Sequence, residues 1–125
     1  MNVIKATTDL SSLPLGRQGE NGRTMILFDV KDLQEEYPEA EIIVVNQKPK
    51  TYSAYACELE ATEEEGVLSW TITSEELTIE GKGCCQLQAT DGTTIARERT
   101  WETSVERGLP YTAPAEEEEE QEEET

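Results

Sequence analysis

The segment 68–109 constrains the fold most, because its polar and apolar residues alternate as they do in antiparallel strands. Residues 68–73 read LSWTIT, in which leucine, tryptophan and isoleucine share one face of a pleated strand, with serine and threonine on the other. The same alternation returns at residues 85–89, and Asp91 and Gly92 follow it with the composition of a tight turn. The segment therefore predicts consecutive antiparallel strands with one buried face.

The return strand of this hairpin, residues 94–105, has a less regular pattern. It is rich in threonine, and Arg97 and Arg99 obscure which of its faces is buried. Such a break in alternation predicts a β-bulge or an edge position in the sheet. An edge strand presents unpaired backbone groups, so we also predict self-association through this strand.

The earlier part of the chain adds four strands and one short helix. The run Ile42 to Val45 predicts a central strand covered on both sides. Residues 31–37 predict one or two helical turns, and residues 10–22 predict a loop, because one proline and three glycines interrupt them. The further strands are predicted over residues 2–7, 24–30, 41–47 and 52–60.

Composition divides the chain into a body and an acidic end. The 125 residues are 35% apolar and include two tryptophans and one phenylalanine, which suffices for one modest core. We predict an all-β antiparallel β-sandwich of about seven strands over residues 1–110, and a tail over residues 111–125. Eight of the last ten residues are glutamate, so the tail is predicted to be disordered.

The charge of the chain bears on its partners. The formal net charge is −18, and removing the eight glutamates of the tail leaves 20 acids against 10 bases, a net charge of −10. Direct binding to nucleic acid needs a basic surface, so we predict none. The tail is interpreted either as a solubilising segment or as an electrostatic contact with a basic partner surface.

Three cysteines, Cys57, Cys84 and Cys85, have no metal-ligand spacing, and the chain contains no histidine to complete a zinc site. We predict reduced thiols; the alternative is a disulfide from Cys57 to one of the vicinal pair, bridging two sheets. The glutamates at 63–65 lack the aspartate-rich spacing of a calcium loop. We predict no metal and no cofactor.

An enzymatic function is not expected from these residues. Paired-acid catalysis needs two carboxyl groups held in a dry cleft, whereas most acids here fall in charge-rich loops and on exposed strand faces. A nucleophile such as Ser69, Ser74 or Cys84 would lack histidine, its commonest base. Trp70 and Trp101 are assigned to the core by alternation, with a binding surface as the alternative.

No apolar run is long enough to span a bilayer, and residues 1–15 lack the pattern of a signal peptide, so we expect no membrane contact and a cytoplasmic site of synthesis. The loop at 10–22 contains GRQGENG, which lacks the lysine and serine of a phosphate-binding loop. Arg17 and Arg23 are predicted to pair with nearby carboxylates. Glycine-rich loops often lie against another surface, so this loop is an interface candidate.

Five sequence strings together resemble the immunoglobulin-like domain of phage baseplate upper proteins and related virion proteins. They are LGRQGENGRTMILFD at 15–29, IIVVNQKP at 42–49, LSWTIT at 68–73, IEGKGCCQLQ at 79–88 and TWETSVERGL at 100–109. The similarity spans residues 2–109, and Glu98 departs from it where members of that family often carry serine. The resemblance implies an immunoglobulin-like sandwich that serves as an assembly module without catalysis.

We therefore expect a non-enzymatic structural protein of a bacteriophage virion, docked on the tail or baseplate or decorating the head, and made in the host cytoplasm. Its partners would be other virion proteins. The predicted interface residues are Leu15, Gly16, Arg17, Gln18, Gly19, Glu20, Arg23, Arg97 and Arg99.

Two other functions are compatible with the sequence. An acidic protein can imitate the charge of DNA and inhibit a nucleic-acid-binding enzyme of the host, although eight of these acids lie in one terminal run rather than along a folded surface. A carbohydrate-binding sandwich is less well supported, because aromatic residues are scarce and both tryptophans are predicted to be buried.

Overall fold

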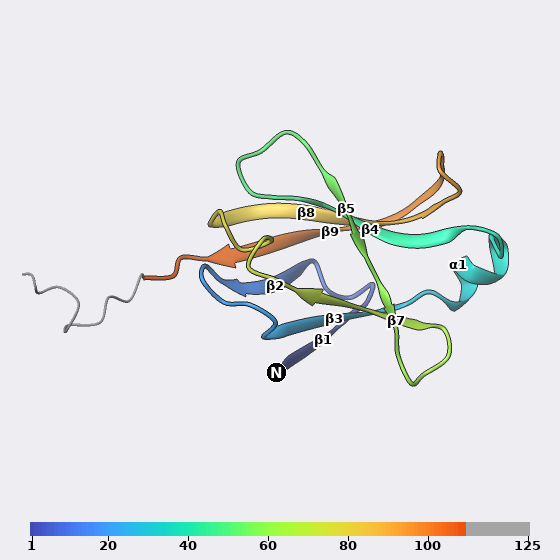
Figure 1. Cartoon of the computed structure of the whole chain (residues 1–125), viewed down its shortest axis with the longest axis horizontal. Helices are drawn as coiled ribbons and strands as arrows, with labels where there is room; N and C mark the ends of the chain where they lie inside the picture. The colour runs from blue at the N-terminus through green and yellow to red at the C-terminus, as the bar shows by residue number, and fades with distance from the viewer. Residues whose placement is uncertain (110–125) are drawn as a thin grey trace, which may run out of the picture.

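A computed structural model describes residues 1–109, which form nine strands and one short helix (Figure 1). The elements in chain order are β1 Asn2–Ala6, β2 Ser12–Arg17, β3 Thr24–Asp29, α1 Lys31–Glu36, β4 Glu41–Gln47, β5 Tyr55–Glu58, β6 Glu60–Ala61, β7 Val67–Ile72, β8 Gly81–Thr90 and β9 Thr94–Glu106. The predicted acidic tail at 111–125 lies outside the described residues.

The strands form two sheets that pack face to face. One sheet has four strands in the order β1-β3-β7-β6, and the other has five in the order β2-β9-β8-β4-β5. Most neighbouring strands are antiparallel, but β1 runs parallel to β3 and β2 runs parallel to β9. The prediction of an all-β protein with a sandwich arrangement is confirmed, and the two parallel pairs are an addition to it.

The chain passes from one sheet to the other along both sides of the sandwich. On one side, residues 7–11 connect β1 of the four-stranded sheet to β2 of the five-stranded sheet. On the other side, only Leu59 separates β5 from β6, so this stretch crosses between the sheets almost as one continuous strand (Figure 1). Each side of the sandwich is therefore bridged by the chain itself.

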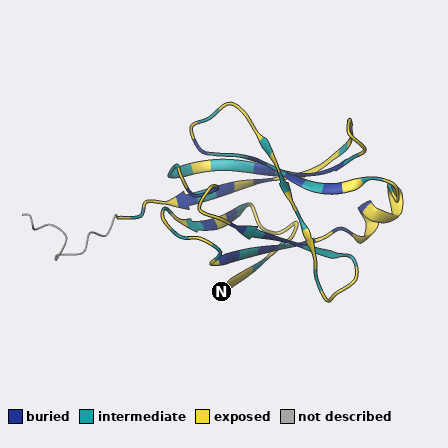
Figure 2. Cartoon of the chain, viewed as in Figure 1, coloured by how far each residue is buried: buried dark blue, intermediate teal, exposed yellow. Residues whose placement is uncertain are grey.

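The core consists of the inward-facing apolar side chains of both sheets (Figure 2). The rings of Phe28 on β3 and Trp101 on β9 contact each other across the two sheets, with centroids 5.4 Å apart and an interplanar angle of 58°. Trp70 is also buried, so the assignment of both tryptophans to the core is confirmed. The other buried apolar residues are Leu13, Leu15, Ile26, Val30, Leu33, Ile42, Val44, Ile72, Leu77, Cys85, Leu87, Ala89 and Val105.

The strand predicted at 42–45 is central, because β4 lies between β8 and β5. Its two faces are not equally covered, however. Ile42 and Val44 are buried in the core, whereas Ile43 and Val45 are only half-buried on the outer face of the sheet. The prediction of cover on both sides is wrong in this respect, since within residues 1–109 only neighbouring side chains shield that outer face.

The prediction of a loop over residues 10–22 is also wrong, because β2 lies within it. Leu13 and Leu15 point into the core, and the strand pairs with β9, about 90 residues later in the chain. Pro14 is compatible with the strand because β2 is an edge strand, where a missing N–H costs no ladder hydrogen bond on the open side. A register shift between Pro14 and Gly16 marks a bulge.

The hairpin prediction at Asp91 and Gly92 is confirmed, with Gly92 at a φ of 107°. The bulge predicted in the return strand is confirmed as well: the register of β9 against β8 shifts twice. The edge prediction is correct for only part of β9. Residues 102–106 pair with β2 on the far side, whereas within the described chain residues 94–100 pair with β8 alone.

We predict that Gly83→Ala destabilises the sandwich. A Cβ at this position would overlap the backbone oxygen of Gln47 and lie 3.1 Å from the hydroxyl of Thr103. Because backbone atoms cannot rotate away, we expect the free energy of unfolding to fall by about 1–3 kcal/mol, measured by urea denaturation. Lys82→Ala, on the same strand but exposed, should change it by less than about 0.5 kcal/mol. Equal stability of the two variants would contradict the close approach of β8 to β4.

Candidate docking interface

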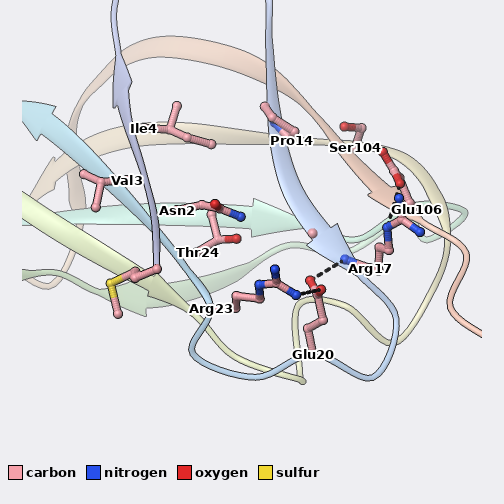
Figure 3. Close-up of a pocket in the computed structure, with 12 residues that line it drawn as sticks. Asn2, Val3, Ile4, Pro14, Arg17, Glu20, Arg23, Thr24, Ser104 and Glu106 are labelled. Carbon is pink, nitrogen blue, oxygen red and sulfur yellow. Dashed lines mark hydrogen bonds and ion pairs between the residues drawn. The ribbon is translucent and has the colours of Figure 1, made fainter. Parts of the chain in front are cut away.

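A cleft opens on the side of the sandwich where β1 and β2 separate into different sheets (Figure 3). Its volume is about 770 Å³. Asn2 and Ile4 of β1 point into it, and Pro14 of β2 lies opposite them. Val3 points to the other face of β1, where it is 56% exposed, and the neighbouring Met1 is 73% exposed. The cleft therefore combines apolar surface with the backbone of two edge strands.

The charged end of the cleft is organised by Glu20. Its carboxylate accepts a hydrogen bond from the backbone N–H of Arg17 at 2.9 Å and another from the guanidinium of Arg23 at 3.2 Å (Figure 3). One acidic side chain thus holds the end of β2 and the start of β3 together. Gly16 makes room for this arrangement, because a Cβ there would lie 2.7 Å from the Glu20 carboxylate, and its φ of +134° disfavours other residues.

A second ion pair joins this end of the cleft to β9. The Nε of Arg17 lies 3.0 Å from the carboxylate of Glu106, and both side chains are more than 60% exposed. The two arginines that line the cleft are thus matched by two glutamates. The prediction of local partners is confirmed for Arg23, which pairs with Glu20, whereas Arg17 pairs with Glu106 on β9. The cleft has no excess of positive charge with which to attract a phosphate or a nucleic acid.

The turn after β2 is fixed to the rest of the domain by Gln18. Its backbone N–H donates to the carbonyl of Glu106 at 3.0 Å, and its side-chain amide donates to the carbonyl of Thr78 at 3.1 Å. The N–H of Gly108 in turn donates to the side-chain oxygen of Gln18 at 3.4 Å. These contacts give the cleft a preformed rim, which lowers the entropic cost of binding a partner there.

The structure brings some of the predicted interface residues together. Gly16, Arg17, Glu20 and Arg23 all line the cleft, and Gln18 and Gly19 form the adjoining turn. Leu15 is only 1% exposed, so it packs beneath this region and presents no side chain to a partner.

Arg97 and Arg99 lie away from the cleft, on the first half of β9. The guanidinium of Arg99 lies 5.9 Å from the ring centroid of Trp101, within the range of a cation–π contact. Arg99 and Trp101, together with Leu33, line a separate hollow of about 520 Å³. The nine predicted residues therefore do not form one surface.

The sequence analysis missed the contribution of β1 to the cleft. Residues 2–7 were predicted as a strand, but neither the sheet that contains it nor its exposed apolar side chains were identified. The available signal was the alternation at the start of the chain, where Val3 and Lys5 share one face of the strand. A valine on the same face as a lysine indicates an apolar side chain that is exposed. The sequence of a short strand does not show which distant strand it pairs with.

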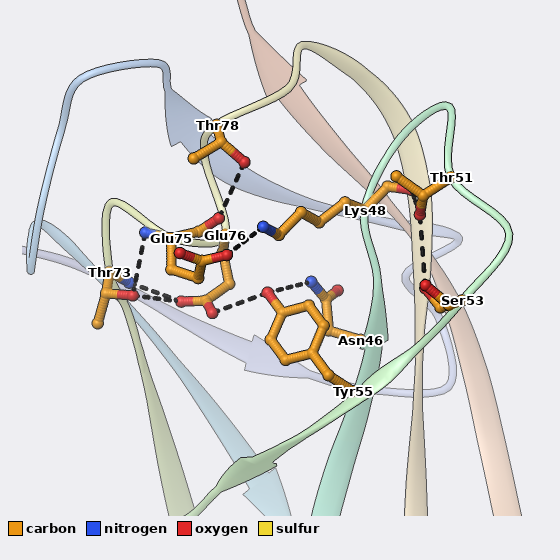
Figure 4. A network of polar contacts seen from close by, with 9 residues as sticks. All are labelled: Asn46, Lys48, Thr51, Ser53, Tyr55, Thr73, Glu75, Glu76 and Thr78. Atoms are coloured by element: carbon orange, nitrogen blue, oxygen red, sulfur yellow. Dashed lines mark hydrogen bonds and ion pairs between the residues drawn. The ribbon is translucent and has the colours of Figure 1, made fainter.

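A buried polar network at another end of the sandwich is the second candidate for a chemical site (Figure 4). Asn46 donates to the hydroxyl of Tyr55 at 3.1 Å, and this hydroxyl donates to Glu76 at 2.9 Å. The other carboxylate oxygen of Glu76 accepts from the N–H and the hydroxyl of Thr73, both at 2.8 Å. Lys48 pairs with Glu75 at its exposed margin.

This network has a structural role. Burial raises the pKa of Tyr55, and the nearby Glu76 carboxylate raises it further, so the hydroxyl remains protonated and acts as a donor. Glu76 is 5% exposed, and its hydrogen bonds go to protein groups that tie the β7–β8 loop to β5 of the opposite sheet. A carboxylate engaged in this way, with a tyrosine that resists ionisation, is poorly suited to act as a base.

The three cysteines are free, and their positions exclude the proposed disulfide between sheets. Cys57 on β5 and Cys85 on β8 belong to the same sheet, with β4 between them. Two strand spacings separate their backbones by about 9–10 Å, beyond the Cα separation of about 7 Å that a disulfide tolerates. Burial raises the pKa of both thiols from 9.0 to about 12, with nearby Glu76 adding to the effect at Cys57 and nearby Cys84 at Cys85.

Residues 1–109 contain no group of three or more cysteine, aspartate or glutamate side chains arranged to hold a metal ion. Over the same residues, no helix is both long enough and apolar enough to cross a bilayer.

Comparison with protein-family models gives no match, and comparison with curated proteins gives none either. Among solved structures, the fold is similar to the N-terminal domain of phage TP901-1 ORF48. The two chains are 14% identical, with a TM-score of 0.54, and the similarity covers 83% of this chain and 94% of that one. At this level of identity, the likeness establishes a shared fold.

We predict that Tyr55→Phe lowers the free energy of unfolding by about 1–3 kcal/mol at neutral pH, because Asn46 and Glu76 each lose a buried hydrogen-bond partner. Urea denaturation measures the change. The matched control is Tyr52→Phe, which removes the same hydroxyl from a fully exposed ring and should have almost no effect. If the two variants unfolded at the same urea concentration, the network would not support the fold.

We also predict slow alkylation of Cys57 and Cys85 in the folded protein. Raising a thiol pKa from 9.0 to about 12 lowers the thiolate fraction at pH 8 about a thousandfold, and only the thiolate reacts. Iodoacetamide labelling followed by peptide mass spectrometry gives the rate at each cysteine, and the same protein in urea supplies the unfolded reference. Equal rates at Cys57 with and without urea would refute the prediction.

Proposed function

We propose that this chain is a non-enzymatic structural domain of a bacteriophage particle, which docks on another virion protein through the β1–β2 cleft. The observation that carries the proposal is the likeness of its fold to a domain of a phage protein, over 94% of that domain. Because one fold serves many functions, the likeness needs independent support from the sequence and from the surface.

The sequence supplies one such support. Its strings at residues 15–29, 42–49, 68–73, 79–88 and 100–109 resemble the immunoglobulin-like domain of phage baseplate upper proteins and related virion proteins. This resemblance rests on the sequence, whereas the structural likeness rests on the path of the backbone. Two different kinds of observation thus point to phage proteins.

We further propose that the sandwich is immunoglobulin-like. The strand order β9-β8-β4-β5 agrees with the G-F-C-C′ order of variable-type immunoglobulin sheets, and the antiparallel pair β3-β7 agrees with their B and E strands. The parallel pairing of β1 with β3 departs from that pattern. The fold would then present the β1–β2 side as one of its open flanks.

The surface supports docking rather than catalysis. Ile4 and Pro14 give the cleft apolar walls next to a preformed rim in which Arg17 and Arg23 are each paired with a glutamate, and the adjoining face of β1 exposes Met1 and Val3. Exposed apolar groups bordered by polar residues are typical of protein-binding surfaces. The partner we propose is a virion protein of the tail, baseplate or head, and the site of the mature protein is the virion.

The test is incorporation into particles of the phage whose genome encodes this chain. We predict that gradient-purified particles contain it at a fixed multiple of their symmetry, measured by quantitative mass spectrometry against the major capsid and tail-tube proteins. In the same phage, Asn2→Glu should reduce the number of copies at least tenfold, because this exposed side chain points into the cleft and a charge there would be buried against the partner.

The control is Thr93→Glu, which adds the same charge at the exposed tip of the β8–β9 hairpin and should leave the copy number unchanged. Absence of the chain from particles, together with abundance in infected cells, would overturn the proposed function and favour an inhibitor that imitates DNA. Normal incorporation of the Asn2→Glu variant would overturn the assignment of the cleft while leaving the virion role intact.

A further inference from the structure

The outer face of the five-stranded sheet has an uncharged centre, which is unusual in a domain whose described residues carry a net charge of −10. Residues paired across neighbouring strands form rows on this face. The central row consists of Thr100 on β9, Gln86 on β8, Val45 on β4 and Ala56 on β5. Depletion of charge at the centre of a surface is the compositional mark of a protein interface.

Side-chain amides give this centre a directional pattern of hydrogen bonds. Gln88 donates to Gln86 at 3.0 Å, and Gln86 donates to the hydroxyl of Thr100 at 2.9 Å. Cys84 and Gln47 occupy the next row, with the thiol 3.7 Å from the amide oxygen, and both line a shallow hollow of about 240 Å³. A primary amide has two N–H donors and two acceptor lone pairs, so each glutamine keeps unused capacity for a molecule placed above the sheet.

One row of this face has opposite charges at its two ends. It runs from Arg97 on β9 through Gln88 and Ile43 to Glu58 on β5. Arg97 and Glu58 are both exposed, and within residues 1–109 neither forms an ion pair. They lie three strand spacings apart, about 14 Å, which is too far for them to pair with each other.

We propose that a second copy of this chain packs on this face about a two-fold axis that runs along the strands. Such an axis places β9 of one copy over β5 of the other, and β8 over β4. Arg97 of each copy then lies opposite Glu58 of its partner, which creates two intermolecular ion pairs, while Gln86 lies opposite Val45. The row of residues is self-complementary, as an isologous interface requires.

The distribution of charge favours this face for self-association. The charged residues around the uncharged centre are Lys82, Arg97, Glu41, Glu58 and Glu102, with a sum of −1. Two copies of the chain, each with a formal net charge of −18, repel one another across most of their surfaces. This face carries little net charge. In one orientation, its positive end attracts the negative end of the same face on a second copy.

The size of the face predicts a weak dimer. Four strands and three rows cover about 19 Å by about 19 Å, which belongs with small interfaces. The interface therefore forms at high protein concentration, or when other contacts hold the copies together. It uses the face of the sheet, and so differs from the predicted pairing through the open edge of β9; it does not depend on the proposed function.

Charge reversal tests the axis directly, by sedimentation velocity of the full chain over a hundredfold range of concentration. Arg97→Glu and Glu58→Arg should each weaken the dimer tenfold or more, because each places like charges opposite one another. The double variant, Arg97→Glu with Glu58→Arg, should recover the wild-type dissociation constant. Lys5→Glu and Glu64→Arg are matched controls, since they make the same changes of charge at exposed positions off this face and should leave the dimer unchanged.

A second measurement tests whether this face becomes covered at high protein concentration. Cys84 points outward in the row next to the central one, so alkylation of Cys84 should be slower at high concentration than at a hundredfold dilution, and this protection should be absent in Arg97→Glu. Circular dichroism of every variant establishes that it is folded.

Three results would overturn the proposal. A wild-type chain that is monomeric throughout, with Cys84 equally reactive at both concentrations, would show that no second copy binds here. Dimerisation that is unaffected by both single reversals would place the interface elsewhere. Recovery of Arg97→Glu by Glu102→Arg, rather than by Glu58→Arg, would show a two-fold axis across the strands instead of along them.

Discussion

The contact between the two sheets, which includes the rings of Phe28 and Trp101, determines which way the neighbouring side chains along each strand point. In a strand, successive side chains face opposite ways, so fixing one residue inside fixes the direction of its neighbours. Trp101 inside places Thr100 and Glu102 outside, and Val44 inside places Ile43 and Val45 outside. The rows on the outer face are thus a consequence of the apolar packing beneath them.

Polar contacts hold the loops and turns at the ends of the sandwich, where the apolar core does not reach. Glu76 joins the β7–β8 loop to Tyr55 of the opposite sheet, and Glu20 holds the turn between β2 and β3. Both carboxylates accept a backbone N–H three residues away in the chain, but their environments differ. Glu76 is buried and its loss of partners should be costly, whereas the exposed ion pairs near Glu20 contribute at most about 1 kcal/mol each.

Much of the fold could be predicted from local patterns, because alternation is a property of a single strand. The strands containing Trp70, Leu87 and Phe28 were identified in this way, and so was the turn at Gly92. β2 was missed because its pattern resembles a loop, with a proline and a glycine inside the strand. Its partner is about 90 residues away and runs parallel to it, and no local signal records such a pairing.

The candidate site shows the same limit. Arg17, Glu20 and Arg23 are close in sequence, so the contacts of Glu20 with both arginines could be predicted from the loop that contains them. The ion pair of Arg17 with Glu106 could not, because it depends on the pairing of β2 with β9. The part played by β1 could not either, because it depends on β1 and β2 belonging to different sheets. The row from Arg97 to Glu58 depends on three strand pairings and on a bulge that shifts the register, and each must be known to within one residue.

The parallel pairing of β2 with β9 has a mechanical consequence. β2 follows the start of the chain and β9 lies near its end, and the two run in the same direction. Tension applied to the two ends would therefore pull these strands in opposite directions along their length. All the hydrogen bonds between them would then bear the load together instead of breaking one after another, as they do when a hairpin is unzipped. A domain connected in this way resists stretching more strongly than its modest core would suggest.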